Sequence, residues 1–197
     1  MKGILARKIG MTRIISPEDG EMVPVTVLEA PKSIILQVKS QEKDGYNALV
    51  LGSFERKHFG KNTNKKYRFI QEIRDLEGEY KKGDCLSLET LKETKTLCIS
   101  GVSKGKGFAG VIKRHNFQRG RETHGSTHHR EPGSVGMCAK PGRILRGKKM
   151  PGHMGAEKVT LRSVPIVHID TEKNLIALKG AIPGAKNSFI FVYEKGK

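Results

Sequence analysis

The chain has 197 residues, with 37 Lys and Arg against 20 Asp and Glu and a formal net charge of +17, so we expect a polyanionic partner such as nucleic acid. It contains no apolar run near the roughly 18 residues of a membrane-spanning helix and no Trp, and its basic start lacks an apolar stretch of signal-peptide length. These features, with three cysteines that form no CxxC pair, predict a cytoplasmic protein without a membrane partner.

Short apolar or alternating segments separated by turn residues recur along most of the chain. They are rich in Val, Ile and Leu, and most are about five to ten residues long, which is typical of strands in a barrel or sandwich. The segments are residues 3–15, 21–30, 33–40, 46–54, 84–91, 95–102, 163–170, 174–181 and 187–194. The polar residues 171–174, between two of these segments, predict a β-hairpin.

Residues 55–80 break this pattern. The sequence between Glu55 and Arg74 is basic and of mixed character, and it fits either a short helix or a long loop. We interpret residues 55–80 as an insertion, helical or looped, in a mainly β globular domain that comprises residues 1–100 and 156–197.

Residues 101–155 have a different composition, and we call them the arm. They carry twelve Lys and Arg and two acidic residues, so they hold +10 of the total charge of +17. They also contain twelve of the 23 glycines, and Gln118–Ser134 includes no residue of the hydrophobic set AVILMFWYC. Such a segment cannot bury enough apolar surface to offset the entropy lost on ordering. The arm is therefore predicted to be a largely irregular insertion between two strands.

A flexible, solvated loop is the simplest interpretation of the arm. However, flexible linkers are rich in Gly and Ser and lack this density of Arg, His and aromatic residues. Arg can bind phosphate with two donors, and aromatic rings can stack on RNA bases. The predicted RNA-binding residues are Lys104, Lys106, Phe108, Lys113, Arg114, His115, Phe117, Arg119, Arg121, His124, His128, His129, Arg130, Lys140, Arg143, Arg146, Lys148, Lys149 and His153.

Two motifs in the arm suggest nucleotide chemistry as an alternative function. Residues 105–110, GKGFAG, match the GxGxxG fingerprint, but Gly120 and Gly125 interrupt the long helix that a dinucleotide site needs. Residues 142–149, GRILRGKK, lack only the final Ser or Thr of a P-loop. Lys149 occupies that position, where the P-loop requires a hydroxyl for Mg²⁺.

Histidines and one cysteine in the arm suggest zinc as a second alternative. The candidates are His124, His128, His129, Cys138 and His153. Structural zinc sites usually have closely spaced ligand pairs, and a single Cys among scattered histidines does not provide them. We expect neither a metal nor a cofactor, nor a small-molecule substrate, and interpret the protein as a binding protein, not an enzyme.

Several long segments of the chain have distinctive sequences: GVSKGKGFAGVIKRHNFQRG, THGSTHHREPGSVG, PGRILRGKKMPGHMG and IDTEKNLIALKGAIPG, together with the opening GILARKIGMTRI. These segments resemble the bacterial form of the ribosomal protein L3 family of the large subunit. The resemblance is weakest over about residues 55–80. It implies a β-barrel of the type found in translation elongation factors, with a long central extension that binds large-subunit ribosomal RNA.

The resemblance further implies a role in early subunit assembly, ribosomal proteins L14 and L19 as neighbours, and an extension that reaches toward the peptidyl transferase centre. The implied tip of the extension comprises Ser134, Val135, Gly136, Met137, Cys138 and Ala139. Some bacterial relatives have a glutamine after the PGSxG element that a methyltransferase modifies, whereas this chain has Met137. Glutamine methylation is therefore not expected here.

Overall fold

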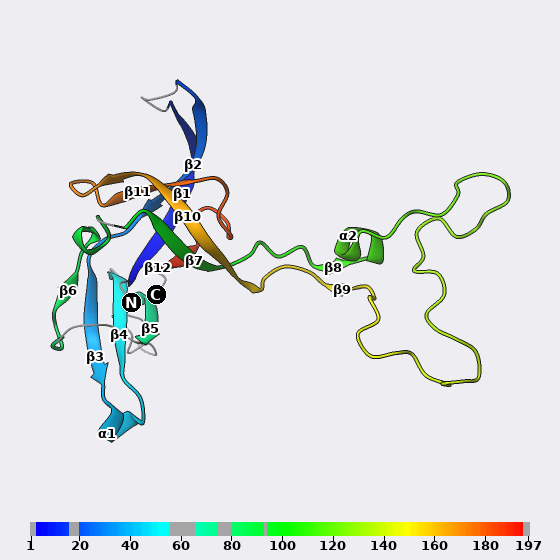
Figure 1. Ribbon diagram of the computed structural model, residues 1–197, viewed down its shortest axis with the longest axis horizontal. Helices are drawn as coiled ribbons and strands as arrows, with labels where there is room; N and C mark the ends of the chain where they lie inside the picture. The colour runs from blue at the N-terminus through cyan, green and yellow to red at the C-terminus, as the bar shows by residue number, and fades with distance from the viewer. Residues whose placement is uncertain (1–2, 16–19, 56–65, 75–79, 93, 195–197) are drawn as a thin grey trace. The chain divides into compact units, whose positions relative to one another are not determined.

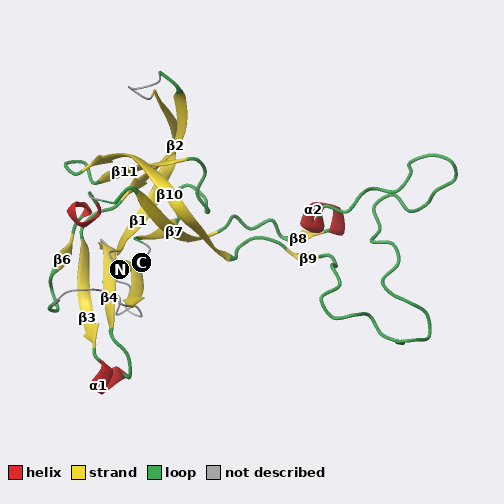
Figure 2. Cartoon of the chain, in the orientation of Figure 1, coloured by secondary structure: helices red, strands yellow, loops and turns green. Residues whose placement is uncertain are grey.

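The computed structural model describes residues 3–15, 20–55, 66–74, 80–92 and 94–194. The fold is mainly β, as predicted (Figures 1 and 2). The chain divides into two compact units. Unit 1 comprises residues 1–103 and 158–197, and unit 2 comprises residues 104–157.

Six antiparallel strands form the main sheet of unit 1 (Figure 1). They are β1 (Gly3–Ile15), β2 (Met22–Glu29), β7 (Thr96–Val102), β10 (Lys158–Asp170), β11 (Leu175–Lys179) and β12 (Phe189–Tyr193). Their hydrogen-bonded order is β1-β12-β7-β10-β11-β2, and β2 in turn pairs with β1. The pairing therefore closes on itself as a barrel, and every strand has two neighbours.

Alternating apolar residues of these strands fill the interior of the barrel. In β1, Ile4 and Ala6 are fully buried in this core, while Leu5 between them is buried in a second apolar cluster. In β12, Ile190 belongs to the barrel core and Phe191 packs against the second cluster. Because successive side chains of a strand point to opposite faces, β1 and β12 are covered on both sides.

A second sheet, with the order β5-β4-β3-β6, contributes most of this second cluster. Its strands are β3 (Ser33–Lys39), β4 (Ala48–Glu55), β5 (Tyr67–Arg74) and β6 (Cys85–Leu86). Ile35, Leu51 and Ile73 of this sheet cluster with Leu5 of β1. Each sheet therefore buries its apolar face against the other or within the barrel, as layered domains require.

Residues 67–74 form a strand, whereas the sequence fitted either a short helix or a long loop. β5 pairs along its length with β4, from Glu55 opposite Tyr67 to Ala48 opposite Arg74. Tyr67 and Ile73, an even number of positions apart, are both buried, which is the period expected of a strand. Polar residues between them concealed this pattern. The other parts of the predicted insertion, residues 56–65 and 75–79, lie outside the described residues.

The predicted strand over residues 84–91 is largely wrong. Only Cys85–Leu86 is a strand, and Leu88–Leu91 is a 3₁₀-helix, η1. Leu88 and Leu91 are both buried in the barrel core. A spacing of three residues places two side chains on one face of a 3₁₀-helix, so these leucines are buried better in this geometry than in an alternating strand.

The predicted hairpin at residues 171–174 is confirmed. β10 and β11 pair in antiparallel fashion, with Asp170 opposite Leu175. The amides of Glu172 and Lys173 each donate a hydrogen bond of 3.0 Å to Oδ1 of Asp170. The Asp side chain thus stabilises the turn by the usual local mechanism of such residues.

Helices are short throughout the part of the chain that the structure describes. They are α1 (Gln41–Asp44), η1 and α2 (Val111–His115). None is long and apolar enough to cross a lipid bilayer.

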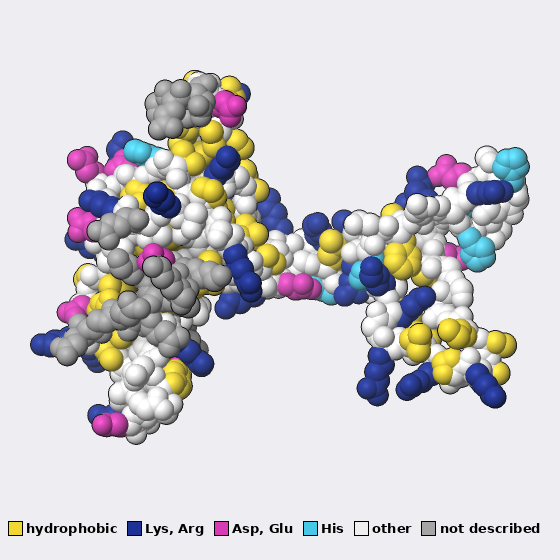
Figure 3. Space-filling view, viewed as in Figure 1, with side chains coloured by type: hydrophobic (Ala, Val, Ile, Leu, Met, Phe, Trp, Pro, Cys, Tyr) yellow, Lys and Arg dark blue, Asp and Glu magenta, His cyan; other side chains and the backbone are white. Residues whose placement is uncertain are grey.

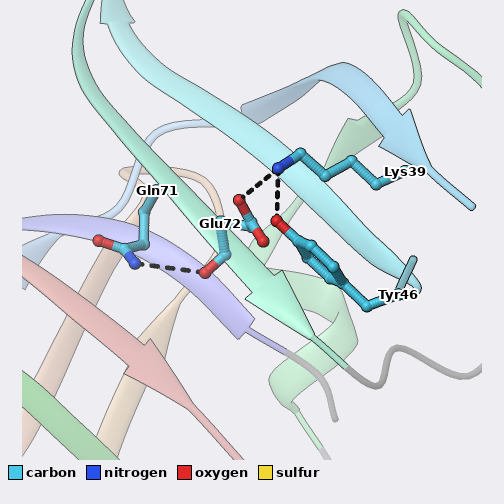
Figure 4. Close-up of polar contacts among 4 residues, drawn as sticks. All are labelled: Lys39, Tyr46, Gln71 and Glu72. Carbon is cyan, nitrogen blue, oxygen red and sulfur yellow. Dashed lines mark hydrogen bonds and ion pairs between the residues drawn. The ribbon is translucent and has the colours of Figure 1, made fainter. Parts of the chain in front are cut away.

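A polar cluster connects β3 to β5 on the second sheet (Figure 4). The Lys39 ammonium donates to the Tyr46 hydroxyl at 2.6 Å and to Oε2 of Glu72 at 3.0 Å. Gln71 donates to the backbone carbonyl of Glu72 at 3.2 Å. The hydrogen bond from Lys39, ahead of the contribution of Tyr46, lowers the pKa of Glu72. The hydrogen bond between Lys39 and Tyr46, and to a smaller extent the one with Glu72, raises the pKa of Lys39.

These shifts predict how the cluster responds to acid. Because the pKa of Glu72 is lower in the folded protein, its contribution to stability is present at neutral pH and is lost as the pH falls through the folded pKa. The variant Glu72→Gln should therefore be less stable than the wild type in urea unfolding at pH 7, and the difference should shrink as the pH falls through the folded pKa of Glu72. Glu172→Gln, at an exposed turn position, is the matched control. A Glu72→Gln difference that is constant with pH would contradict the prediction.

Candidate nucleic-acid interface

The first and last residues of unit 2 pair to form its base, which we call the neck (residues 104–117 and 150–157). Two short strands, β8 (Phe108–Ala109) and β9 (Gly152–His153), pair in antiparallel fashion. The amide of Lys106 donates to the Met154 carbonyl and the amide of Met154 donates to the Gly107 carbonyl, each at 2.9 Å. The neck therefore contains regular structure that backbone hydrogen bonds within the chain hold together.

Helix α2 follows β8 and fastens it to the other side of the neck. Nη1 of Arg114 donates to the Met150 carbonyl at 2.9 Å, and Nε2 of His115 lies 3.0 Å from the same oxygen. Val111 and Ala109, which lie close to this connection in the sequence, are buried. These contacts join residues 35 and 36 positions apart in the chain, so the two sides of the neck are held together.

Two glycines allow the backbone to approach itself closely in unit 2. A Cβ at Gly155, where φ is +76°, would lie 2.1 Å from the Lys104 carbonyl oxygen. A Cβ at Gly120 would lie 1.8 Å from the carbonyl oxygen of His128. Neither position can accept a side chain without a shift of the backbone. The glycine content of the arm thus serves close backbone contacts in addition to flexibility.

The polar segment 118–131 folds back on itself through a few hydrogen bonds. The amide of Gly120 donates to the His129 carbonyl at 3.2 Å, and Nδ1 of His129 lies 3.1 Å from the Arg121 carbonyl. Nη2 of Arg119 pairs with Glu122 at 2.6 Å, and His128 pairs with Glu131. The acidic residues of this segment are therefore engaged by its own side chains.

Residues 132–149 form loops and turns, and their side chains are exposed (Figure 2). A few local hydrogen bonds stabilise these turns. The hydroxyl of Ser134 donates to the Gly136 carbonyl at 3.1 Å. The amide of Lys148 donates to the Leu145 carbonyl at 3.3 Å. Met137 is 76% exposed, and Cys138 is a free, exposed thiol. All six residues of the predicted tip, Ser134, Val135, Gly136, Met137, Cys138 and Ala139, are exposed.

The positive charge of unit 2 faces solvent. All twelve Lys and Arg of this unit are exposed except Arg114, which is half-buried. Lys and Arg side chains are spread over its visible surface, and few acidic groups lie among them (Figure 3). The three acids of unit 2, Glu122, Glu131 and Glu157, cannot neutralise this number of cations. The surface is therefore suited to a polyanion.

The structure distinguishes among the predicted RNA-binding residues. Arg114 and His115 contact the Met150 carbonyl and so organise the neck, a function that the sequence interpretation missed. Phe117 is half-buried, with its ring centroid 6.2 Å from that of His115. Phe108, by contrast, is 79% exposed. The one signal in the sequence for the neck contacts was the clustering of glycines.

The alternative nucleotide sites lack the necessary geometry. The GxGxxG match, residues 105–110, leads into a five-residue helix rather than the long helix that supports a pyrophosphate. The near P-loop, residues 142–149, lies in turns, with no strand before it and no helix after it. Across the described residues, no three His, Cys, Asp or Glu side chains are grouped so that they could hold a metal ion.

Comparison with known proteins identifies consistent relatives. The family model described as "Ribosomal protein L3" matches residues 79–177. The chain is 46% identical to large ribosomal subunit protein uL3 of Spiroplasma kunkelii, over 98% of this chain and 78% of the relative. It is 44% identical to the protein of that name from Oceanobacillus iheyensis, over 96% of this chain and 95% of the relative. The chain is 45% identical to the Shouchella clausii protein of the same name, over 100% of this chain and 98% of the relative.

Proposed function

Because the chain belongs to the ribosomal protein L3 family, we propose that it binds large-subunit ribosomal RNA directly and that unit 2 is its main RNA interface. As a family member, it is a structural protein of the large ribosomal subunit. The observation that supports the RNA interface is the charge of unit 2, in which twelve Lys and Arg, eleven of them exposed, are accompanied by three acids.

These cations would act by neutralising phosphates that otherwise repel one another when RNA helices pack. The predicted contacts are Lys104, Lys106, Lys113, Arg119, Arg121, Arg130, Lys140, Arg143, Arg146, Lys148 and Lys149, with His124, His128, His129 and His153 as further polar contacts. Phosphate contacts fix position and carry little sequence information. Recognition would therefore depend more on the shape of the folded RNA than on base edges.

The rest of the proposed function rests on the family resemblance. We propose that unit 1 is a barrel of the elongation-factor type and that the protein nucleates early subunit assembly in the cytoplasm. Residues 134–139 would approach the peptidyl transferase centre, and ribosomal proteins L14 and L19 would be neighbours. The similarity to large ribosomal subunit proteins uL3 over nearly the full chain supports these proposals.

The salt dependence of binding tests the electrostatic part of the proposal. If half of the twelve cations contact phosphate, the plot of log affinity against log salt should have a slope of about −4 to −5. Affinity of the full chain for a large-subunit ribosomal RNA transcript should then fall roughly 250- to 1,000-fold between 50 and 200 mM salt. Filter binding at four or five salt concentrations measures this slope. A slope near zero would refute phosphate binding as the main source of affinity.

A further inference from the structure

We propose that the exposed face of the β8–β9 ribbon is a stacking site for one unpaired base of RNA, with Phe108 as the platform and His153 beside it. The proposal rests on the proposed function and deepens it, because it assigns to the neck a contact with a base rather than with phosphate. The ligand class is a single-stranded nucleotide in a loop or bulge of the RNA.

The register of the ribbon separates its two faces. Phe108 lies opposite His153, and Ala109 lies opposite Gly152. Directly opposed residues of an antiparallel pair project from the same face, and successive residues from opposite faces. Ala109 is 3% exposed, so its face is the one that packs against the rest of the neck. Phe108 and His153 therefore share the outer face.

The packed face of the ribbon is held by α2. A Cβ at Gly152 would lie 2.6 Å from Nη1 of Arg114, so the guanidinium group passes directly over this glycine. The same group is bonded to the Met150 carbonyl, and Val111 is 2% exposed. The ribbon is thus supported from behind, and the orientation of its outer face is fixed by protein contacts alone.

The outer face is open to a flat ligand. Phe108 is 79% exposed, the highest value among the exposed large apolar residues described for the chain. Gly107 and Gly110 flank the β8 strand, and no heavy atom beyond their chain neighbours lies within 4 Å of the position that a Cβ would take at either. A ring on a fixed strand with open space around it has the features of aromatic platforms that stack RNA bases.

The charge around the ribbon favours a nucleobase over an apolar side chain of another protein. Lys104 and Lys106 precede Phe108 on the same side of the neck, and both are exposed. An unpaired nucleotide offers a π-face for the ring and a phosphate for these cations. An apolar protein segment would leave the cations without partners. Base stacking on an aromatic residue is tolerant of sequence because every base has such a face.

The test uses the full chain and a large-subunit ribosomal RNA transcript as the probe, with Phe108→Ala and Phe108→Tyr as the variants. Phe108→Ala should bind about 5- to 150-fold more weakly, the range expected for loss of one stacked base, with an unchanged salt slope. Phe108→Tyr should bind like the wild type, because it keeps the ring. Lys106→Ala is the contrasting variant and should reduce the magnitude of the slope by about 0.7 to 0.9.

Chemical probing of the RNA supplies the readout that a merely structural role would not change. One unpaired nucleotide should be protected by the wild type and by Phe108→Tyr and become reactive with Phe108→Ala, while protections in helices persist. Hydrogen exchange at the amides of Lys106 and Met154, which are bonded in the neck, should be the same in all three proteins. Loss of this protection in Phe108→Ala would overturn the proposal, because the ring would then be structural.

The remaining outcomes separate this site from the proposed function. If Phe108→Ala binds RNA like the wild type while the steep salt slope remains, the stacking site is wrong and RNA binding by unit 2 stands. The stacking site is equally wrong if subunits made with Phe108→Ala lack a neighbouring protein but keep every RNA protection. If wild-type binding itself shows no salt dependence, the proposed function fails and the stacking site fails with it.

Discussion

A variant in which a short glycine–serine linker replaces residues 118–149 is expected to bind large-subunit ribosomal RNA about 250- to 600-fold more weakly at 150 mM salt. The replacement removes eight of the twelve cations of the arm. If half of them contact phosphate, four contacts are lost, and each contributes about 0.6 to 0.7 decades of affinity at this salt concentration. Filter binding compares the variant with the wild type.

The same variant tests the independence of the two units. Met150 is retained, so the contacts of Arg114 and His115 with its carbonyl can still form. The core of the barrel lies wholly in unit 1, so the urea unfolding transition should be unchanged. Supplied as the sole copy, the variant should impair maturation of the large subunit. A variant that unfolds would show that unit 1 depends on residues 118–149. It would contradict the division of the chain into two independent units.

A second large loss of RNA affinity is expected when positive charge is removed by substitution, without deletion of residues. The combined variant Arg143→Gln, Arg146→Gln, Lys148→Gln and Lys149→Gln should bind the RNA about 20-fold more weakly at 150 mM salt if half of these cations contact phosphate, and several hundredfold more weakly if all do. All four side chains are exposed, so folding should not change. Filter binding gives the affinity, and its salt slope should become shallower.

The matched control removes the same charge from unit 1. Lys43, Lys92, Lys173 and Lys186 are exposed there, and their replacement by Gln lowers the net charge by the same amount. The control should lose much less affinity, because a general attraction between a basic protein and RNA would respond equally to both sets. Equal losses would mean that total charge, and not the surface of unit 2, determines binding.

The strands were largely predictable because their sequence period matches their burial. Ile4 and Ala6 alternate along β1, and the polar turn after Asp170 marks the β10–β11 hairpin. β5 was missed because Arg68, Gln71 and Glu72 dilute the apolar alternation that pairing with β4 nevertheless uses. In these segments tertiary pairing determined the structure, which local composition could not reveal.

The charge of the candidate interface was also predictable, whereas its internal order was not. A segment with few apolar residues has too small a core to bury its cations, so their exposure follows from composition. The bond between Arg114 and the Met150 carbonyl joins residues 36 positions apart, and no periodic pattern encodes it. The same holds for the pairing of Phe108 with His153, which gives the ribbon its two faces.

Ultraviolet crosslinking of intact large subunits, followed by mass spectrometry of the peptides joined to RNA, tests most directly whether unit 2 is the main RNA interface. We predict that most crosslinked peptides come from residues 104–157, with Phe108 among the crosslinked positions because stacked aromatic rings lie close to their bases. Crosslinks confined to residues 3–103 and 158–194 would contradict the proposal.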